Sequence, residues 1–155
     1  MKPWIQKALK IRGNRRGNVM IEFAIGSGVL LAAFTGTFQF GYTFLQYNNL
    51  QNAVARGARY ASLVPYDSPT TVPSAAFQTA VQNMVLYGSP TVGTTPVLAG
   101  LTAGNANLTV TFTDGIPSAM TVFISGYTIN SVFATTTLTT KPQVTYAYQG
   151  IWSPV

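Results

Sequence analysis

The sequence predicts an α+β protein in which a long N-terminal helix precedes a short helix and a small, mostly antiparallel β-sheet. Three observations lead to this prediction. Residues 23–45 are apolar and uncharged, residues 46–61 keep an apolar spacing of three to four, and from residue 107 onward apolar and polar residues alternate. At 155 residues the chain has room for one membrane anchor and one modest folded domain.

Positive charge is concentrated at the N-terminal end. Six of the nine Lys and Arg residues precede Gly17: Lys2, Lys7, Lys10, Arg12, Arg15 and Arg16. As a helix, the apolar run from Phe23 to Leu45 would cover about 30 Å or more, enough to cross a bilayer core. By the positive-inside rule we expect residues 1–16 in the cytoplasm, a single pass through the membrane and the C-terminal part outside. A basic block in this position is a topology signal, so we expect no nucleic-acid partner.

Beyond the apolar run the chain is expected to remain helical and then to break. No proline interrupts residues 19–61, so we predict one helix from Val19 to Ala61, its first half in lipid and its second half projecting outward. Val64–Pro73 contains three prolines and ends this helix. Ser74 can cap a second helix from Ala75 to Tyr87, whose apolar face would be Phe77, Val81, Met84 and Val85.

A period of two then predicts β-strands. Asn107–Asp114 and Ala119–Ile124 alternate apolar and polar residues, and Asp114–Pro117 between them supplies the turn of a hairpin. The remaining strand candidates are Tyr127–Phe133, Thr135–Thr140 and Gln143–Tyr148.

The residue inventory argues against catalysis. The chain has no histidine and no cysteine, and its acidic residues are Glu22, Asp67 and Asp114. We therefore predict no catalytic residue, no metal site and no cofactor, and hence no enzyme. Asp67 and Asp114 each lie in a predicted turn, where aspartate is common. Arg56 and Arg59 share a helix face, and we interpret them as solvated or helix-terminal side chains.

Two features of the apolar run suggest partners. Glu22 is a single carboxylate where the run begins, and such a charge is costly unless it is paired or extends to the membrane interface. Residues Ala24, Gly28, Ala32 and Gly36 recur every four residues. They form either a stripe of small residues on which another helix packs closely or a chance spacing in a span rich in Ala and Gly.

A cleaved secretory signal is a rival interpretation of the N-terminal segment. Ala53-Val54-Ala55 has the form of a signal-peptidase site. Against this interpretation, the apolar region is longer than the usual span of about 7–15 residues. A polar stretch, residues 46–52, also separates it from the site.

The stretch Gly17-Asn18-Val19-Met20-Ile21-Glu22-Phe23 resembles the processing site of type IV prepilins. With the apolar span, the aromatic exit Phe40–Leu45 and the run Gly57-Ala58-Arg59-Tyr60-Ala61, it resembles more narrowly the TadE-like pseudopilins of tight-adherence (Flp-type) pili. The resemblance covers about residues 12–63, and Val144–Tyr148 is similar to the family's final strand. Asn18 departs from the Phe or Met that is usual at the first mature position.

This resemblance implies a site and its partners. Prepilin peptidase would cut between Gly17 and Asn18 and remove a basic leader, residues 1–17. Glu22 would then be the fifth residue of the mature chain and would guide assembly by pairing with a new N-terminal amine. Phe23 would belong to the same subunit-assembly site. The other implied partners are pilin and pseudopilin subunits, the pilus assembly platform and the membrane. Residues 18–63 would form the transmembrane and projecting helix, and residues 64–155 an extracytoplasmic, pilin-like α+β domain.

The sequence therefore predicts a structural protein of the inner membrane or of an extracellular pilus, which initiates, primes or decorates a pilus used for adhesion or secretion. The alternative is a single-pass, membrane-anchored binding domain that never polymerises.

Overall fold

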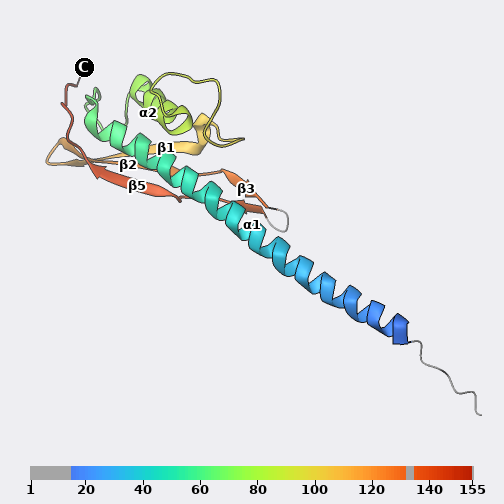
Figure 1. Ribbon diagram of the computed structural model, residues 1–155. Helices are drawn as coiled ribbons and strands as arrows, with labels where there is room; N and C mark the ends of the chain where they lie inside the picture. Colours follow the sequence, from blue (N-terminus) through green and yellow to red (C-terminus); the bar gives the residue numbers. More distant parts are fainter. Residues whose placement is uncertain (1–14, 132–134, 155) are drawn as a thin grey trace, which may run out of the picture. The chain divides into compact units, whose positions relative to one another are not determined.

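The computed structural model describes residues 15–131 and 135–154. Its elements in chain order are α1 (Arg15–Leu63), α2 (Ala75–Tyr87), the 3₁₀ helix η1 (Ala103–Asn105), β1 (Ala106–Thr113), β2 (Ile116–Ile124), β3 (Thr128–Asn130), β4 (Thr135–Thr137) and β5 (Gln143–Ala147) (Figure 1). The chain separates into two compact units, residues 1–38 and residues 39–155. The predicted α+β class is confirmed. Most of the predicted leader, and Phe133 at the end of a predicted strand, lie outside the described residues.

The long helix is confirmed and is slightly longer than predicted. α1 begins at Arg15 and ends at Leu63, against the predicted limits Val19 and Ala61. The helix contains no proline, and its many alanines and leucines favour the helical conformation. It ends two residues before Pro65, whose ring disfavours helical geometry in the residue that precedes it.

Within residues 39–155, one face of α1 forms part of the core. Leu50, Ala53, Val54, Ala58 and Ala61 have no exposed surface, and their spacing places them on one side of the helix. A signal-peptidase cut after Ala55 would remove the first three of these residues from the core. The rival interpretation as a cleaved secretory signal therefore conflicts with the packing of the folded domain.

Both ends of α2 are capped, and its predicted limits are confirmed. The Phe77 N–H donates to Ser74 Oγ at 3.1 Å, which satisfies one of the unpaired donors of the first turn. Gly88 ends the helix in the left-handed conformation, with φ 71°, and its N–H donates to the Met84 carbonyl at 3.0 Å. The buried face includes Phe77, Val81 and Val85 as predicted, whereas Met84 is half-buried and Leu86 takes a buried place.

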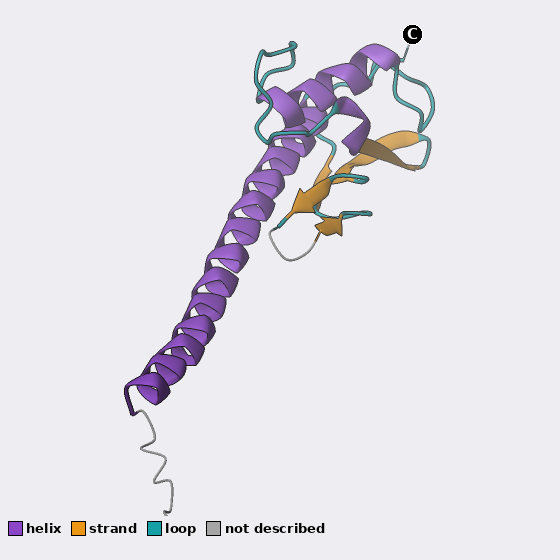
Figure 2. Cartoon of the chain, turned by 90° about the vertical axis from the view of Figure 1, so that its right-hand side faces the viewer, coloured by secondary structure: helices purple, strands orange, loops and turns teal. Residues whose placement is uncertain are grey.

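The main sheet is antiparallel and has the strand order β1-β2-β5, so β2 is its central strand (Figure 1). Figure 2 shows the strands in orange beside the helices in purple. The predicted alternation in β2 is confirmed, because Met120, Val122 and Ile124 are fully buried. The β1–β2 turn consists of Asp114 and Gly115, with φ 53° and 80°. Two-residue hairpin turns of this kind need positive φ at both positions, which Gly adopts freely and Asp tolerates.

Three strand predictions need different limits. β2 begins at Ile116, three residues before the predicted Ala119, because a register shift at Thr111 and Phe112 extends the pairing with β1. β3 and β4 are three residues each and form a separate two-stranded sheet, whereas longer strands over residues 127–133 and 135–140 were predicted. The last predicted strand, Gln143–Tyr148, is confirmed as β5, which ends one residue earlier, at Ala147.

The Tyr148 side chain links the C-terminal segment by hydrogen bonds to the residues that follow α1. Its hydroxyl accepts a hydrogen bond from the Tyr66 N–H at 2.8 Å and lies 2.8 Å from the Ile151 carbonyl oxygen, to which it can donate. Burial raises the pKa of the Tyr148 hydroxyl, and the hydrogen bond from Tyr66 acts in the opposite direction. Tyr66 is itself fully buried, with its ring edge-on to Phe77 at a centroid distance of 5.2 Å.

α1 and α2 approach each other closely at Gly57. A Cβ atom at this position would overlap Val85 Cγ2 and would lie 3.6 Å from the Val81 carbonyl oxygen. Val85 is β-branched, fully buried and stiff, so it has little freedom to move aside. The absence of a side chain at Gly57 thus sets the packing distance between the two helices.

Replacing Gly57 with Ala should destabilise the protein. We expect a net loss of about 1–2 kcal/mol, because overpacking costs about 1–3 kcal/mol while alanine regains up to about 1 kcal/mol of helix propensity. Thermal unfolding of the full chain in detergent, followed by circular dichroism, measures the change. Gly104→Ala is the matched control, because the nearest atom to its new Cβ is Thr102 Oγ1 at 3.9 Å. A Gly57→Ala chain as stable as the wild type would contradict the packing described here.

Candidate functional site

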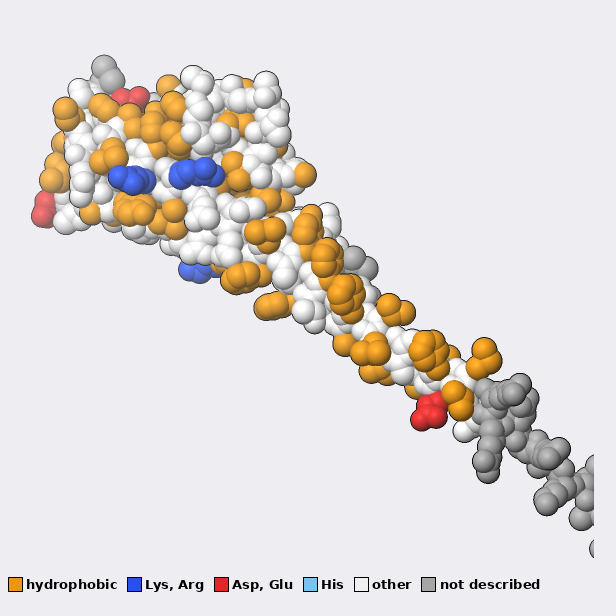
Figure 3. Space-filling model, viewed as in Figure 1, with side chains coloured by type: hydrophobic (Ala, Val, Ile, Leu, Met, Phe, Trp, Pro, Cys, Tyr) orange, Lys and Arg blue, Asp and Glu red, His pale blue; other side chains and the backbone are white. Residues whose placement is uncertain are grey.

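The described part of the first unit is helix alone, and its apolar side chains are exposed (Figure 3). Phe23 is 76% exposed and Phe34 is 71% exposed. The other large apolar side chains exposed in this part are Val19, Met20, Ile21, Ile25, Val29, Leu30, Leu31 and Phe38. Such a surface is unfavourable in water, at roughly 25 cal/mol per Å² of apolar area. By length and composition, this helix is the one candidate membrane span in the described part of the chain.

The hydroxyl groups of this apolar helix are satisfied within it. Ser27 Oγ donates to the Ala24 carbonyl at 3.0 Å, and Thr35 Oγ1 donates to the Leu31 carbonyl at 2.7 Å. Thr37 Oγ1 donates likewise to the Ala33 carbonyl at 3.0 Å. Because these donors have backbone acceptors one turn earlier, the helix can enter hydrocarbon without leaving them unpaired.

Gly17 and Asn18 lie in the first turn of α1. The first four N–H groups of a helix have no acceptor within it, so few hydrogen bonds hold this turn together. Among the described residues, no atom lies within 4 Å of the position that a Gly17 Cβ would occupy, beyond the helix's own backbone and the chain neighbours. The peptide bond between Gly17 and Asn18 is therefore in a segment that can unwind at small cost and is sterically open.

Glu22 follows Asn18 by one helical turn and is exposed. It forms no ion pair with any residue in the described ranges. The apolar side chains of Ile21 and Phe23 beside it are also exposed. A carboxylate in this setting needs a cation from outside the described chain if the helix is surrounded by lipid or by other apolar helices.

The four small residues form an open stripe. Ala24, Gly28, Ala32 and Gly36 follow one another at intervals of four, which places them near one another on one side of α1. A Cβ atom at Gly28 or Gly36 would meet no atom of another described element within 4 Å. In the described structure the stripe is therefore uncovered at these two glycines.

The two other carboxylates have local roles in the fold. Asp67 Oδ2 accepts a hydrogen bond from the hydroxyl of Ser74, the N-cap of α2, at 2.6 Å. Asp114 occupies the first of the two positive-φ positions of the β1–β2 turn. The prediction that Asp114 lies in a turn is confirmed. In the described ranges, 15–131 and 135–154, no three His, Cys, Asp or Glu side chains gather where they could hold a metal ion.

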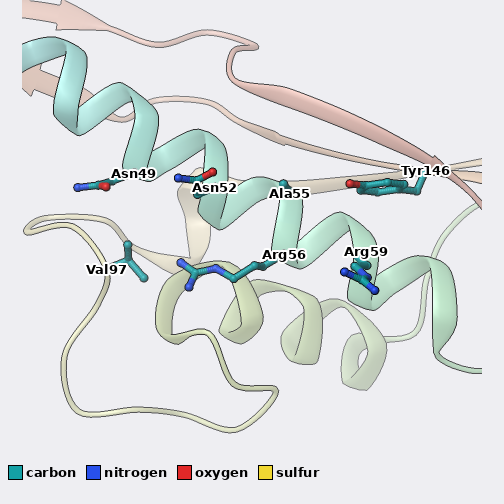
Figure 4. Close-up of a pocket in the computed structure, with 7 residues that line it drawn as sticks. All are labelled: Asn49, Asn52, Ala55, Arg56, Arg59, Val97 and Tyr146. Carbon is teal, nitrogen blue, oxygen red and sulfur yellow. The ribbon is translucent and has the colours of Figure 1, made fainter.

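Sequence reasoning missed one feature of residues 39–155, a groove of about 540 Å³ beside the exposed face of α1 (Figure 4). Its lining residues are Asn49, Asn52, Ala55, Arg56, Arg59, Val97 and Tyr146. Arg56 and Arg59 are exposed, as predicted, and Arg56 Nη1 lies beside Gly88 at the C-terminal end of α2. The position of Arg56 suits the dipole of α2, an interaction that no local sequence signal shows.

The comparisons with known proteins give one finding. Residues 17–59 match the family model described as TadE-like protein. No curated protein and no solved structure matches the chain. The matched segment begins at Gly17, contains Glu22 and the whole stripe of small residues, and ends at Arg59.

Placing a charge in the exposed apolar helix should weaken membrane attachment. Phe34→Lys is expected to shift part of the protein from the alkali-resistant membrane pellet to the soluble fraction, because lysine at the centre of a span costs about 3 kcal/mol on insertion scales. Gln149→Lys, at an exposed position in the folded domain, is the control and should stay in the pellet. Equal fractionation of the two variants would argue against residues 23–45 as the anchor.

Proposed function

We propose that the chain is a TadE-like pseudopilin, a structural subunit that initiates, primes or decorates a Tad-type (Flp) pilus. The observation that carries the proposal is the match to the TadE-like family, because it starts at the residue after which the sequence predicts a cut. Two features support it independently of the match: the exposed apolar helix, and Glu22, which has no ion-pair partner among the described residues. In a pilus, neighbouring subunits would supply apolar contacts for the helix and a cationic amine for Glu22.

The first step in this proposal is processing by prepilin peptidase. The enzyme would cut between Gly17 and Asn18 and release the basic leader. Gly17 suits the position before the cut because it presents no side chain, and the first turn of α1 is held by few hydrogen bonds. Cleavage leaves the rest of α1 intact and creates an amine on Asn18.

Glu22 then has a defined task. As the fifth residue of the cut chain, it would lie one turn from the amine of its own Asn18 and close to equal amines on packed neighbours. An ion pair between Glu22 and a neighbour's amine would set the axial position of each new subunit as its helix enters the filament base. Phe23 and the small-residue stripe would make the apolar contacts beside this pair.

The same helix gives the expected location. Before assembly the subunit would be held in the inner membrane by a single pass, with its N-terminus in the cytoplasm and residues 64–155 outside. Its partners would be prepilin peptidase, other pilin and pseudopilin subunits and the assembly platform. Under the alternative function, a membrane-anchored binding domain that never polymerises, the anchor is retained but Glu22 has no neighbouring amine to neutralise it.

Replacing Glu22 with Ala should separate processing from assembly. We expect the leader to be removed as in the wild type, because Gly17 and its neighbours are unchanged. We expect surface pili to fall by about tenfold or more, because removal of one partner from a buried ion pair typically costs about 3–5 kcal/mol. Immunoblot mobility reports processing, and electron microscopy of cells reports piliation.

Thr37→Ala is the matched control for this variant. It lies on the same helix, and its hydroxyl donates only to the Ala33 carbonyl, so piliation should be unchanged. Normal piliation in the Glu22→Ala strain would remove the role assigned to Glu22. Uncut protein in that strain would instead place Glu22 in recognition by the peptidase.

A further inference from the structure

One edge of the main sheet is open. β5 pairs with β2 on one side, and the strand order β1-β2-β5 leaves its other side without a neighbouring strand in the described structure. Four of its five residues are exposed. The opposite edge, β1, packs against α2, and Gln82 Nε2 donates there to the Ala106 carbonyl at 3.1 Å.

The hydrogen-bond register shows which groups of β5 face outward. The Tyr148 N–H donates to the Ser118 carbonyl at 2.8 Å, and the Ile124 N–H donates to the Pro142 carbonyl at 3.1 Å. Because bonded and non-bonded pairs alternate in an antiparallel ladder, the even-numbered residues of β5 point their backbone groups toward β2. The N–H and C=O groups of Gln143, Thr145 and Ala147 therefore point away from it, and they have no hydrogen-bond partner among the described residues.

This edge adjoins a cation of α1. Arg59 and Tyr146 line both the groove described above and a second groove of about 400 Å³, which also reaches Ala147 and Gln149. The Tyr146 ring lies between β5 and α1, close to Arg59 (Figure 4). Arg59 forms no ion pair with any described residue. The open strand edge thus lies beside a guanidinium group that has no anionic partner among the described residues.

We propose that the open edge of β5 binds an extended, acidic segment of a different protein. The segment would add a fourth strand to the sheet by backbone hydrogen bonds to Gln143, Thr145 and Ala147, as in β-strand addition. One of its carboxylates would meet Arg59, which matches a carboxylate well because a guanidinium can donate two parallel bonds.

The chain's own acidic residues explain why a second copy is not the occupant. The chain has three: Glu22 lies within α1, and Asp114 lies in a two-residue turn. Asp67 is half-buried and bonded to Ser74. None of them stands in an exposed, extended segment that could lie along β5. The acidic strand must therefore come from another protein.

The test uses the full chain in non-ionic detergent and labelled seven-residue peptides, Thr-Glu-Val-Glu-Val-Glu-Thr and the same peptide with Lys in place of Glu. Fluorescence anisotropy should show binding of the acidic peptide and not of the basic one. Thr145→Pro removes the outward N–H of β5 without touching the ladder to β2, and should weaken binding about tenfold or more. Thr145→Ala is its matched control, since it also loses the bond to Thr121 Oγ1 but keeps the N–H.

Charge is tested in the same way. Arg59→Gln should lower the affinity for the acidic peptide about tenfold, whereas Lys141→Gln, an exposed cation that lines neither groove, should change it less than about twofold. If Thr145→Pro fails to fold, the wild-type chain is tested with two acidic peptides, each N-methylated at one of the two alternating sets of amides. Only the peptide whose methyl groups replace the N–H groups that face β5 should lose binding.

Three results would overturn the proposal. One is equal binding of the acidic and basic peptides, and another is no binding of either at millimolar concentration. The third is a self-association of the chain that Thr145→Pro abolishes and Thr145→Ala retains, because it would make a second copy the occupant.

Discussion

The structure depends on one helix that has to satisfy two different surroundings. Over residues 50–61, α1 buries a narrow face against the rest of the folded domain, with five residues fully enclosed. Over residues 19–38 the same helix exposes nearly all of its large apolar side chains. The backbone of α1 is helical through both parts. A cut at Ala55 would destroy the core, whereas a cut at Gly17 would leave both parts whole.

This constraint determines where function can lie. The exposed apolar part carries a single carboxylate, Glu22, and the folded domain has few charges and no metal-binding cluster among its described residues. Among the described residues, the apolar part has no partner that shields it from water, and its carboxylate has no counter-ion in lipid. A filament of such helices supplies both, provided that an amine is created one turn from Glu22. The proposed function therefore connects the cleavage at Gly17 with the charge at Glu22.

Sequence patterns predicted most of the fold because the signals were local. The absence of proline and the apolar spacing gave α1, Ser74 gave the start of α2, and the turn residues Asp114–Pro117 gave the hairpin. The limits of β2, β3 and β4 were harder, since a register shift at Thr111 and the division into two sheets depend on distant pairing. Gly17, Asn18 and Glu22 could be chosen from the sequence, and their roles remain predictions. The groove beside the exposed face of α1 could not be predicted, because its sides come from residues far apart in the chain.

The intact mass of the protein extracted from its native membrane is the most direct test of cleavage at Gly17 and of the pairing of Glu22. We predict a chain that begins at Asn18, in which Glu22 is the fifth residue and a new amine lies one turn away. A chain that retains Met1 would show a plain membrane anchor and contradict the pairing proposed for Glu22. A chain that begins at Arg56 would show an ordinary secretory signal and would contradict both the anchor and the role of α1 in the core.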